Sequence, residues 1–285
     1  MRLGILTIER DNVVNDLIDV CKKKDIDYHV INPKNIVTDL DNVYHYKLSL
    51  KHLDAIFVRN LGYDSFFRFD ILKFLEEFCF VVNPYETINL ASNKFLSSIM
   101  FKKLDIPHPE TYVTENISEA LKIIDYLEDA VIKPLFGSGG EGIIRLKKEH
   151  SITKKIKDLE EFQKKYTTFY IQKFVECKYD DYRDIRVFIV GDELYPIYRI
   201  GGDNWKNNIS LGGRVEICEL DIEMRKICYK VKKAFNLYYG GIDLLEGDKT
   251  YILEVNSTPS WKGASIIYND IPEKVLNMII EETKK

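Results

Sequence analysis

The sequence predicts a protein of the mixed α/β and α+β class, and three observations support that fold class. In residues 1–92, short apolar runs alternate with amphipathic stretches, which is typical of a small parallel α/β unit. In residues 177–285, strand-like runs are denser, and a helical stretch over 221–235 interrupts them. The chain has 285 residues, 45% of them hydrophobic, which is enough for one large domain or two to three small ones.

The N-terminal α/β unit is expected to span residues 1–92. It opens with the apolar run LGILTI at 3–8, which we interpret as a buried strand, and Asp11 can cap the helix that follows. Apolar side chains recur at helical spacing after that aspartate. Further elements are expected as strands at 28–31, 54–59 and 80–83 and as a helix around 66–77.

A central part over 93–176 and a C-terminal part over 177–285 are expected to follow. The stretch NKFLSSIMFKKL has helical spacing, and Pro107 and Pro109 stop that helix. Strands are expected at TYVT, AVIK, IIRL and FYIQKFV in the central part, and at DIRVFIVG, ELYPIYRI, GGIDLLE and TYILEVN in the C-terminal part. A last helix is expected after Asp270, which is placed to cap it.

Composition argues against several classes of function. The net charge is −4 and the pI is about 5.9, so no basic face for a nucleic-acid partner is expected. No run of 18 or more apolar residues occurs, and the N-terminal run is too short for a signal peptide, so no membrane association is expected. The five cysteines lack C-x-x-C spacing and fit free thiols in a reducing compartment. We therefore expect a cytoplasmic globular protein.

A glycine-rich loop lies in the stretch VIKPLFGSGGEGIIRL, where four glycines fall within six residues. The string fits the G-x-G-x-x-G pattern of dinucleotide sites, but it leads into a β-like run, whereas that pattern requires a helix. We therefore predict a strand–loop–strand flap that brings backbone N–H groups close to phosphates, with Gly137, Ser138, Gly139 and Gly140 at its centre. An ordinary hairpin turn would need only one or two glycines.

Two lysines are candidates to meet those phosphates. Lys133 closes an apolar strand just before the glycine loop, and an ammonium group in such a place is costly unless it finds an anion. Lys94 opens the preceding helix, where a phosphate contact and an ordinary surface position are equally plausible.

The stretch GIDLLEGDKTYILEVN at 241–256 predicts a β-hairpin. If Asp248 and Lys249 form a two-residue loop, Asp243 pairs with Glu254 across the strands. The two carboxylates would then face each other directly.

Asn256 lies two residues beyond Glu254 and is expected to share its face of the hairpin. Two opposed carboxylates among apolar neighbours repel each other unless a cation intervenes, and oxygen ligands of this kind suit Mg²⁺. The alternative is a solvated hairpin face that tolerates an unfavourable like-charge pair.

Together, the glycine flap, the lysine at a strand end and the D…E-x-N hairpin resemble the ATP-grasp superfamily, and in detail its RimK branch of glutamate ligases. Seven segments occur in that family's order, namely NPYETINLASNKF, VIKPLFGSGGEGI, YIQKFVE, RDIRVFIVGDE, KNNISLGG, GGIDLL and LEVNSTPS. The resemblance implies an ATP-grasp fold, in which a Rossmann-like N-terminal α/β domain precedes two mixed α+β subdomains that clamp ATP.

The resemblance also implies which residues bind the nucleotide. Lys94 and Lys133 match the lysines that contact ATP phosphates, and Asp184 matches a nucleotide-binding acid. The remaining nucleotide-binding positions implied are Gln172, Lys173, Phe174, Val175, Lys206, Asn207 and Asn208.

Asp243, Glu254 and Asn256 match the family's magnesium ligands, and Arg186 and Arg199 match basic positions near the transferred phosphate. The sequence departs from the family pattern at Leu211, where a basic residue often precedes the double glycine, and Arg214 could replace it.

The activity implied is an ATP-dependent joining of L-glutamate to a carboxylate, with Mg²⁺ as the metal and Mn²⁺ able to substitute. Transfer of the γ-phosphoryl group would make an acyl phosphate, and the amine would then displace phosphate. The implied acceptor is a carboxylate-bearing coenzyme: tetrahydromethanopterin first, then a polyglutamylated deazaflavin, then a ribosomal or carrier protein. A nucleotide-binding protein without ligase activity and a kinase are the alternatives from other classes, and a homo-oligomer is left open.

The part of the site that holds the acceptor is less legible in the sequence. Arg59, at a predicted strand end, could meet an anionic substrate, but we favour an exposed loop arginine. Ser257, Thr258 and Lys262 follow the predicted metal ligands and could contact substrate.

Overall fold

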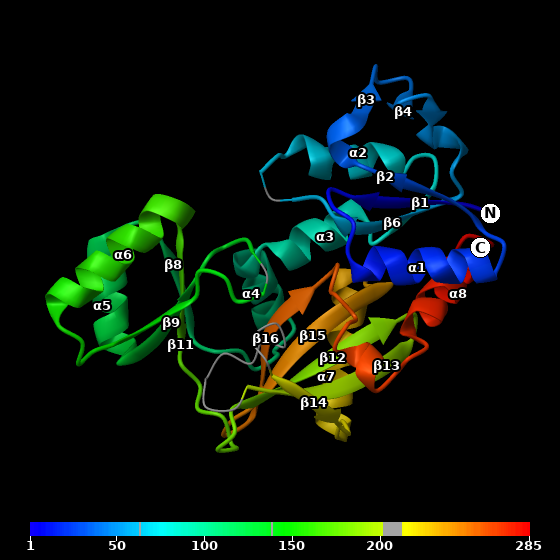
Figure 1. Cartoon of the computed structure of the whole chain (residues 1–285). Helices are drawn as coiled ribbons and strands as arrows, with labels where there is room; N and C mark the ends of the chain where they lie inside the picture. The colour runs from blue at the N-terminus through cyan, green and yellow to red at the C-terminus, as the bar shows by residue number, and fades with distance from the viewer. Residues whose placement is uncertain (63, 138, 202–212) are drawn as a thin grey trace.

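The computed structural model describes residues 1–62, 64–137, 139–201 and 213–285. Figure 1 shows a lobe built on one small sheet at the left and a larger body at the right, in which the N-terminal sheet lies above a second, longer sheet. The N- and C-termini lie close together on that body. Within the described ranges, no helix combines the length and apolar character needed to cross a membrane.

The N-terminal unit is a parallel sheet with strand order β2-β1-β6-β7, as predicted. Its elements are β1 (Arg2–Thr7), α1 (Asn12–Lys23), β2 (Asp27–Ile31), β6 (Ala55–Asn60), α2 (Phe67–Leu75) and β7 (Phe80–Val82). Asp11 caps α1 as expected, because its Oδ1 accepts a hydrogen bond of 3.1 Å from the Val14 N–H.

A small antiparallel sheet formed by β3 (Ile36–Thr38), β4 (Val43–His45) and β5 (Leu48–Ser49) was not predicted from the sequence. Strands of two or three residues are too short to show a hydrophobic period.

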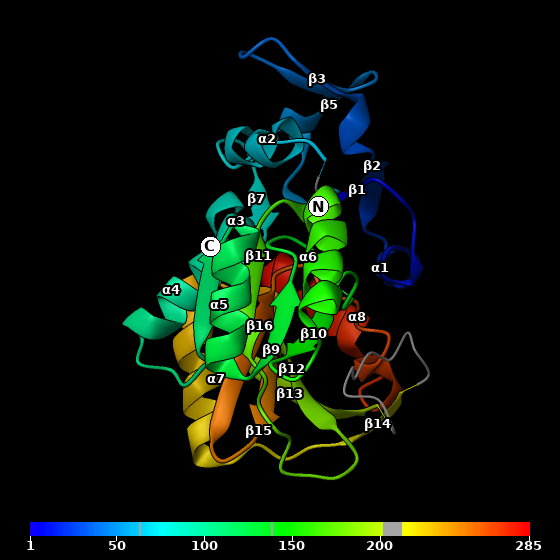
Figure 2. The same cartoon turned by 90° about the vertical axis from the view of Figure 1, so that its left-hand side faces the viewer.

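The central lobe is an antiparallel sheet with strand order β10-β9-β11-β8. Its elements are β8 (Thr111–Thr114), α5 (Ile117–Leu127), β9 (Asp129–Lys133), β10 (Ile144–Lys147), α6 (Ile152–Tyr166) and β11 (Phe169–Lys173). Figures 1 and 2 show α5 and α6 on the outer face of this sheet, so that its other face is turned toward the body. The lobe has a core of its own, which includes Ile124, Ile132, Leu159 and Phe169.

The longest sheet has strand order β14-β13-β12-β15-β16 and is antiparallel. Its strands are β12 (Arg183–Val190), β13 (Glu193–Ile200), β14 (Arg214–Ile217), β15 (Tyr239–Glu246) and β16 (Thr250–Asn256). The helices α3 (Tyr85–Ser92), α4 (Lys94–Lys103) and α7 (Ile222–Phe235) contribute to one core with this sheet. Of these, α3 was not predicted.

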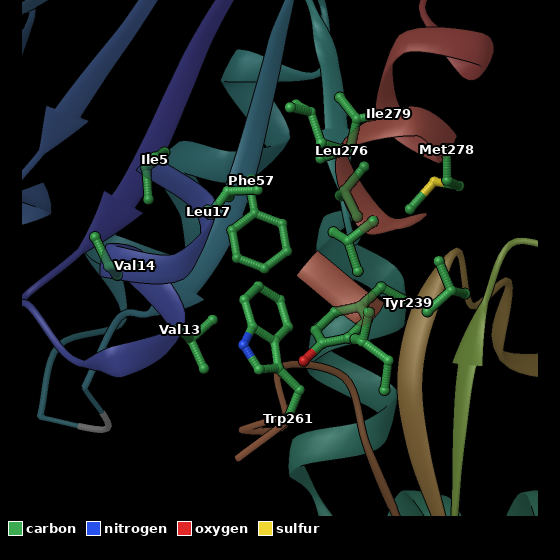
Figure 3. Packing of buried hydrophobic residues seen from close by; sticks show 14 of the residues in the cluster. Ile5, Val13, Val14, Leu17, Phe57, Tyr239, Trp261, Leu276, Met278 and Ile279 are labelled. Carbon is green, nitrogen blue, oxygen red and sulfur yellow. The ribbon is translucent and has the colours of Figure 1, made fainter. Parts of the chain in front are cut away.

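The last helix, α8 (Ile271–Glu282), packs against α1 at the other side of the sheet. Asp270 occupies its N-cap position, but the expected side-chain capping bond is not formed, and the carboxylate instead lies 3.4 Å from Lys274 Nζ. Figure 3 shows the resulting core, in which Trp261 and Tyr239 pack beside Phe57 of β6. The N-terminal unit and the C-terminal sheet therefore share one hydrophobic core.

The division into parts 1–92, 93–176 and 177–285 stays a proposal. The packing distinguishes the central lobe from the other two parts. The lobe has a core of its own, whereas the first and third parts share the core around Trp261.

Candidate active site

One cavity of about 810 Å³ lies between the sheets. The central lobe contributes the glycine loop and the end of β11 to its wall, and the long sheet contributes β12, β13, β15 and β16. Residues from the end of β6 and from the segment after β16 complete the lining. A cavity of this size with several convergent charges is the kind of place where a nucleotide and a second substrate fit together.

The hairpin of β15 and β16 carries the predicted metal ligands, and Asp243 stands opposite Glu254 as predicted. The predicted loop is wrong, however. Glu246 pairs with Thr250, so the turn holds three residues, 247–249, and its Gly247 N–H donates to Lys249 O at 2.9 Å. That turn alone would place Leu253 opposite Asp243.

A β-bulge restores the expected pairing. Leu244 pairs with Ile252 while Asp243 pairs with Glu254, so Leu253 is an extra residue between them. Leu253 consequently lines the cavity together with Glu254.

Asp243 is 3% exposed and lies against two arginines. Arg186 donates to it through both Nε and Nη2, the latter at 2.7 Å to Oδ2, and Arg199 Nη2 donates to the same oxygen at 2.8 Å. Arg199 also forms a bidentate pair with Asp184, with both bonds at 2.7 Å. The metal end of the cavity, defined as these four residues with Glu254, therefore carries three carboxylates and two guanidinium groups.

The arginines decide the charge state of Asp243. Burial by itself would raise the pKa of Asp243, but Arg186 and Arg199 outweigh it and hold that pKa well below its ordinary value. For Asp184, burial prevails and the pKa is raised despite Arg199. Asp243 thus stays ionised, which is the state that a metal ligand needs.

Alternation along β12 explains why the arginine reaches this site. Ile185, Val187 and Ile189 belong to the core that includes α7, whereas Arg186 lines the cavity. A Cβ atom at Gly241 would lie 3.0 Å from Arg186 Cδ and 3.2 Å from its Nη1. The missing side chain at Gly241 therefore leaves room for Arg186 to lie across β15.

The remaining donors fit a magnesium ion. Asn256 Nδ2 donates to Glu254 Oε1 at 3.0 Å, so the amide lies on the same face as the carboxylate pair. In the described part of the chain, no group of three or more His, Cys, Asp or Glu side chains has metal-binding geometry. An ion here would therefore have two carboxylates and an amide as ligands and take further oxygens from water or phosphate, as Mg²⁺ commonly does.

The lysine end of the cavity, defined as Lys94, Lys133 and the glycine loop, is organised differently. Lys133 Nζ donates to Gln172 Oε1 at 2.7 Å, and Lys94 Nζ donates to Gly137 O at 2.9 Å. Neither lysine forms an ion pair with any described residue. Burial of its ammonium group lowers the pKa of Lys133 to about 8, because the loss of water outweighs the attraction of the nearby Glu254 and Asp243 carboxylates.

The glycine loop joins β9 to β10, which confirms a strand–loop–strand flap. Gly137, Gly139, Gly140 and Gly142 have φ values of 138°, 71°, 74° and 72°, a region that other residues rarely adopt. Ser138 lies outside the described residues, as do the predicted nucleotide contacts Lys206, Asn207 and Asn208 and the atypical Leu211.

The end of β11 also lines the cavity, with Gln172, Lys173, Phe174 and Val175 in the order predicted. The Gln172 side chain is held by Tyr170 and Thr111, so it positions Lys133. The Arg145 guanidinium lies 3.3 Å from the centroid of the Phe174 ring, which holds that ring against the lobe. These four residues stay predicted nucleotide contacts.

Several apolar residues of the cavity wall were not predicted, among them Val131, Leu245 and Leu253. Val131 and Leu245 share a strand face with Lys133 and Asp243, so a period of two was the signal that could have found them. Leu253 lacks such a signal because the bulge places it there.

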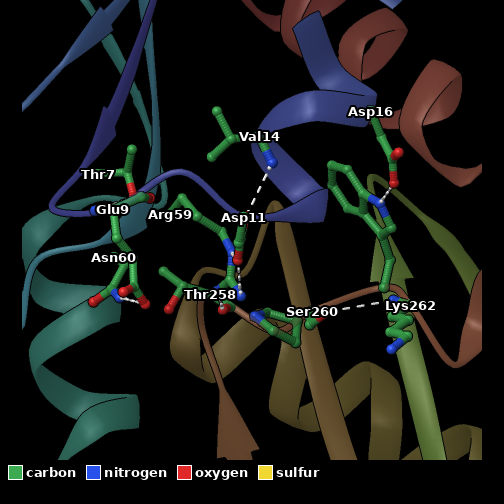
Figure 4. Close-up of polar contacts among 12 residues, drawn as sticks. Thr7, Glu9, Asp11, Val14, Asp16, Arg59, Asn60, Thr258, Ser260 and Lys262 are labelled. Carbon is green, nitrogen blue, oxygen red and sulfur yellow. Dashed lines mark hydrogen bonds and ion pairs between the residues drawn. The ribbon is translucent and has the colours of Figure 1, made fainter. Parts of the chain in front are cut away.

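The expectation of an exposed Arg59 is wrong. Its side chain is 15% exposed, forms an ion pair of 2.8 Å with Asp11 and lines the cavity. Figure 4 shows this arginine next to Asp11 and Thr258. The partners lie 48 and 199 positions away in the sequence, so no local pattern reveals them.

The cleft between a glycine-flap lobe and a sheet with opposed carboxylates defines an ATP-grasp protein. Over 99% of this chain, the fold is similar to the ATP-grasp ligase PsnB solved with minimal precursor, Mg and ADP, which is covered over 98% of its chain, with a TM-score of 0.72 and 16% identity.

The chain belongs to the RimK-like ATP-grasp family, whose domain profile matches residues 91–279. It is 53% identical over the full length of both chains to the tetrahydromethanopterin:α-L-glutamate ligase of Methanocaldococcus jannaschii. It is also 38% identical, again over all of both chains, to the ligase of the same name from Methanococcus maripaludis.

Proposed function

We propose that the protein is an ATP-dependent ligase that joins L-glutamate to a carboxylate of tetrahydromethanopterin, releasing ADP and phosphate. The observation that carries the ligase proposal is the pairing of Asp243 with Glu254 on the wall of a cavity that also contains two lysines without ion-pair partners among the described residues. The acceptor is supported by the full-length similarity to ligases named for that coenzyme.

The nucleotide would lie between the two lobes. Lys94, Lys133 and the glycine loop would bind its phosphates, and the segment Gln172–Val175 would flank the base. Asp243, Glu254 and Asn256 would hold Mg²⁺, which neutralises phosphate charge when bound. Arg186 and Arg199 line the same wall and would stabilise charge on the transferred phosphoryl group.

The chemistry needs positioning more than covalent help from the protein. A carboxylate is a poor electrophile, so the γ-phosphoryl group is first transferred to it, and the amine then attacks the acyl phosphate. Closure of the lobes around the cavity would keep water away from that intermediate.

A product assay tests the proposal. The protein is incubated with ATP, Mg²⁺, L-glutamate and either tetrahydromethanopterin or a polyglutamylated deazaflavin coenzyme, with a parallel series in Mn²⁺. We expect the tetrahydromethanopterin product to gain the mass of one glutamyl residue. ADP release without glutamate, accompanied by a phosphorylated product, would instead identify a kinase. Glutamylation of the deazaflavin alone would refute the proposed acceptor.

A further inference from the structure

The segment that follows the metal hairpin is held rigidly at the cavity. Asn83 Nδ2 donates to Ser257 O at 2.6 Å, and the Tyr239 hydroxyl donates to Pro259 O. Trp261 is fully buried, and its Nε1 donates to Asp16 Oδ2 at 2.8 Å. The 257–262 loop, as we call it, is therefore anchored in three places, at Ser257, Pro259 and Trp261.

The 257–262 loop lines the cavity with every residue except Trp261, and its cation, Lys262, is solvent-exposed. Lys262 forms no ion pair or side-chain hydrogen bond with any residue that the structure describes, and its backbone N–H donates to Ser260 Oγ at 3.4 Å. The backbone of Lys262 is held by the adjacent buried Trp261, while its ammonium group stays available to a ligand.

Arg59 reaches the same loop from β6. Its Nε and Nη2 bind Asp11 at 2.9 and 2.8 Å, and its Nη1 donates to Thr258 O at 2.5 Å. A guanidinium group has five N–H donors, so two remain after these contacts. Figure 4 shows Arg59 and Thr258 side by side, with Ser260 and Lys262 further along the loop.

Neither cation is needed for the nucleotide in the proposed function. The lysine end supplies charge for the phosphates, and the metal end supplies the ligands for magnesium. Glu9 and Asn60 lie beside Arg59 and are linked at 3.4 Å, so this part of the wall also offers a carboxylate and an amide. The Glu9 carboxylate would repel a polyphosphate, so the mixture of charges suits an organic substrate that carries both a carboxylate and a hydrogen-bond donor or ammonium group.

We infer that Arg59, Thr258 and Lys262 form a carboxylate subsite. This subsite binds a substrate carboxylate other than the one that receives the γ-phosphoryl group. The inference rests on the proposed ligase function and adds a residue-level site for its substrates. The carboxylate has two sources, the incoming L-glutamate or the acceptor coenzyme. In both cases Lys262 supplies charge and Arg59, held by Asp11, supplies directed N–H donors.

The test uses Lys262→Gln in the full chain, with Lys226→Gln as the matched control. Lys226 is an exposed lysine on α7 that is paired with Glu223 and does not line the cavity. We expect Lys262→Gln to raise the KM for L-glutamate or for tetrahydromethanopterin about tenfold, the effect of one charge-assisted hydrogen bond, and to leave the KM for ATP unchanged. The substrate whose KM rises identifies the source of the carboxylate.

Arg59→Lys provides a second variant that keeps the charge and loses the planar fork. It is expected to raise the KM for the same substrate, with a smaller effect on kcat. Values within twofold of the wild type for both substrates in Lys262→Gln would overturn the subsite, and so would an equal rise in the control.

A binding measurement separates this inference from the proposed function. L-Glutamate and tetrahydromethanopterin are titrated by calorimetry into protein loaded with ADP and Mg²⁺. Weaker binding of one of them to Lys262→Gln supports the subsite even if the wild type forms no glutamyl product. Unchanged binding of both to the variant, or no binding of either to the wild type, overturns it.

Discussion

The metal end and the lysine end of the cavity balance their charges in opposite ways. At the metal end, Arg186 and Arg199 already neutralise most of the carboxylate charge, and every one of these groups sits on a single sheet. At the lysine end, Lys94 and Lys133 bind neutral oxygen atoms and remain positive. The charges at the metal end are therefore largely balanced by the fold itself, whereas the charges at the lysine end are balanced only when an anion binds. Substitutions at the metal end should consequently affect turnover and the stability of the fold, whereas substitutions at the lysine end should affect nucleotide affinity.

The largest effect is expected for Glu254→Gln. Glu254 is half-buried, accepts a hydrogen bond from Asn256, and has only a loose ion pair with an arginine, at 3.9 Å from Arg186 Nη2. We expect kcat to fall by roughly 10³-fold through loss of a metal ligand, with little change in thermal unfolding. The rate of ADP release in the presence of all substrates measures kcat. Release at a near wild-type rate would remove Glu254 from the metal site.

Asp243→Asn should differ from Glu254→Gln in stability. Removal of this carboxylate leaves Arg186 and Arg199 buried with one partner fewer, and breaking a buried ion pair costs about 3–5 kcal/mol. Urea unfolding of the two variants side by side measures the difference. Equal stabilities would show that the arginines find other partners and that the two carboxylates are equivalent in the fold.

Lys133→Ala should act on binding and leave the fold intact. Its ammonium group is costly to bury in the free protein, so its loss does not destabilise the fold, but it removes a charged contact to phosphate. We expect ATP to bind about 10- to 100-fold more weakly by calorimetry. Unchanged affinity would contradict its role at the phosphates.

The pKa of Lys133 also predicts a pH dependence. The folded chain releases this proton near pH 8, whereas the unfolded chain keeps it to about 10.5, so its contribution to the free energy of unfolding rises with pH between those values. Bound phosphate favours the ammonium form. Nucleotide affinity should therefore fall above about pH 8, by up to about tenfold per pH unit. Titrations from pH 7 to 9.5 measure it, and Lys133→Arg, which stays charged, should flatten the profile.

Gly241→Ala is the mildest test of the metal end. The added methyl group would meet Arg186 at 3.0 Å and displace it from Asp243. We expect kcat to fall by about tenfold or less and stability to fall by about 1–2 kcal/mol, as for overpacking. Full activity in Gly241→Ala would show that Arg186 adjusts without cost.

The fold class and the parallel N-terminal unit could be predicted because they depend on local periodicity. Strands such as β8 and β13 were found at their observed residues, since four to eight residues of pattern define each of them. The strands β3 to β5 escaped prediction because two or three residues show no alternation, and the helix α3 escaped it because about two helical turns are too few to show a helical period.

What the sequence by itself determined was the set of charged residues and, for Asp243 and Glu254, the fact that they meet. Tertiary structure decided how they meet. The turn is one residue longer than expected, and a bulge at Leu253 compensates in the edge strand β16, while β15 is also paired with β12. Only the tertiary structure buries Arg59 between Asp11 and Thr258, and only it brings two arginines into hydrogen-bonding contact with Asp243. Such contacts join segments far apart in the chain, and their energy depends on packing that no local pattern encodes.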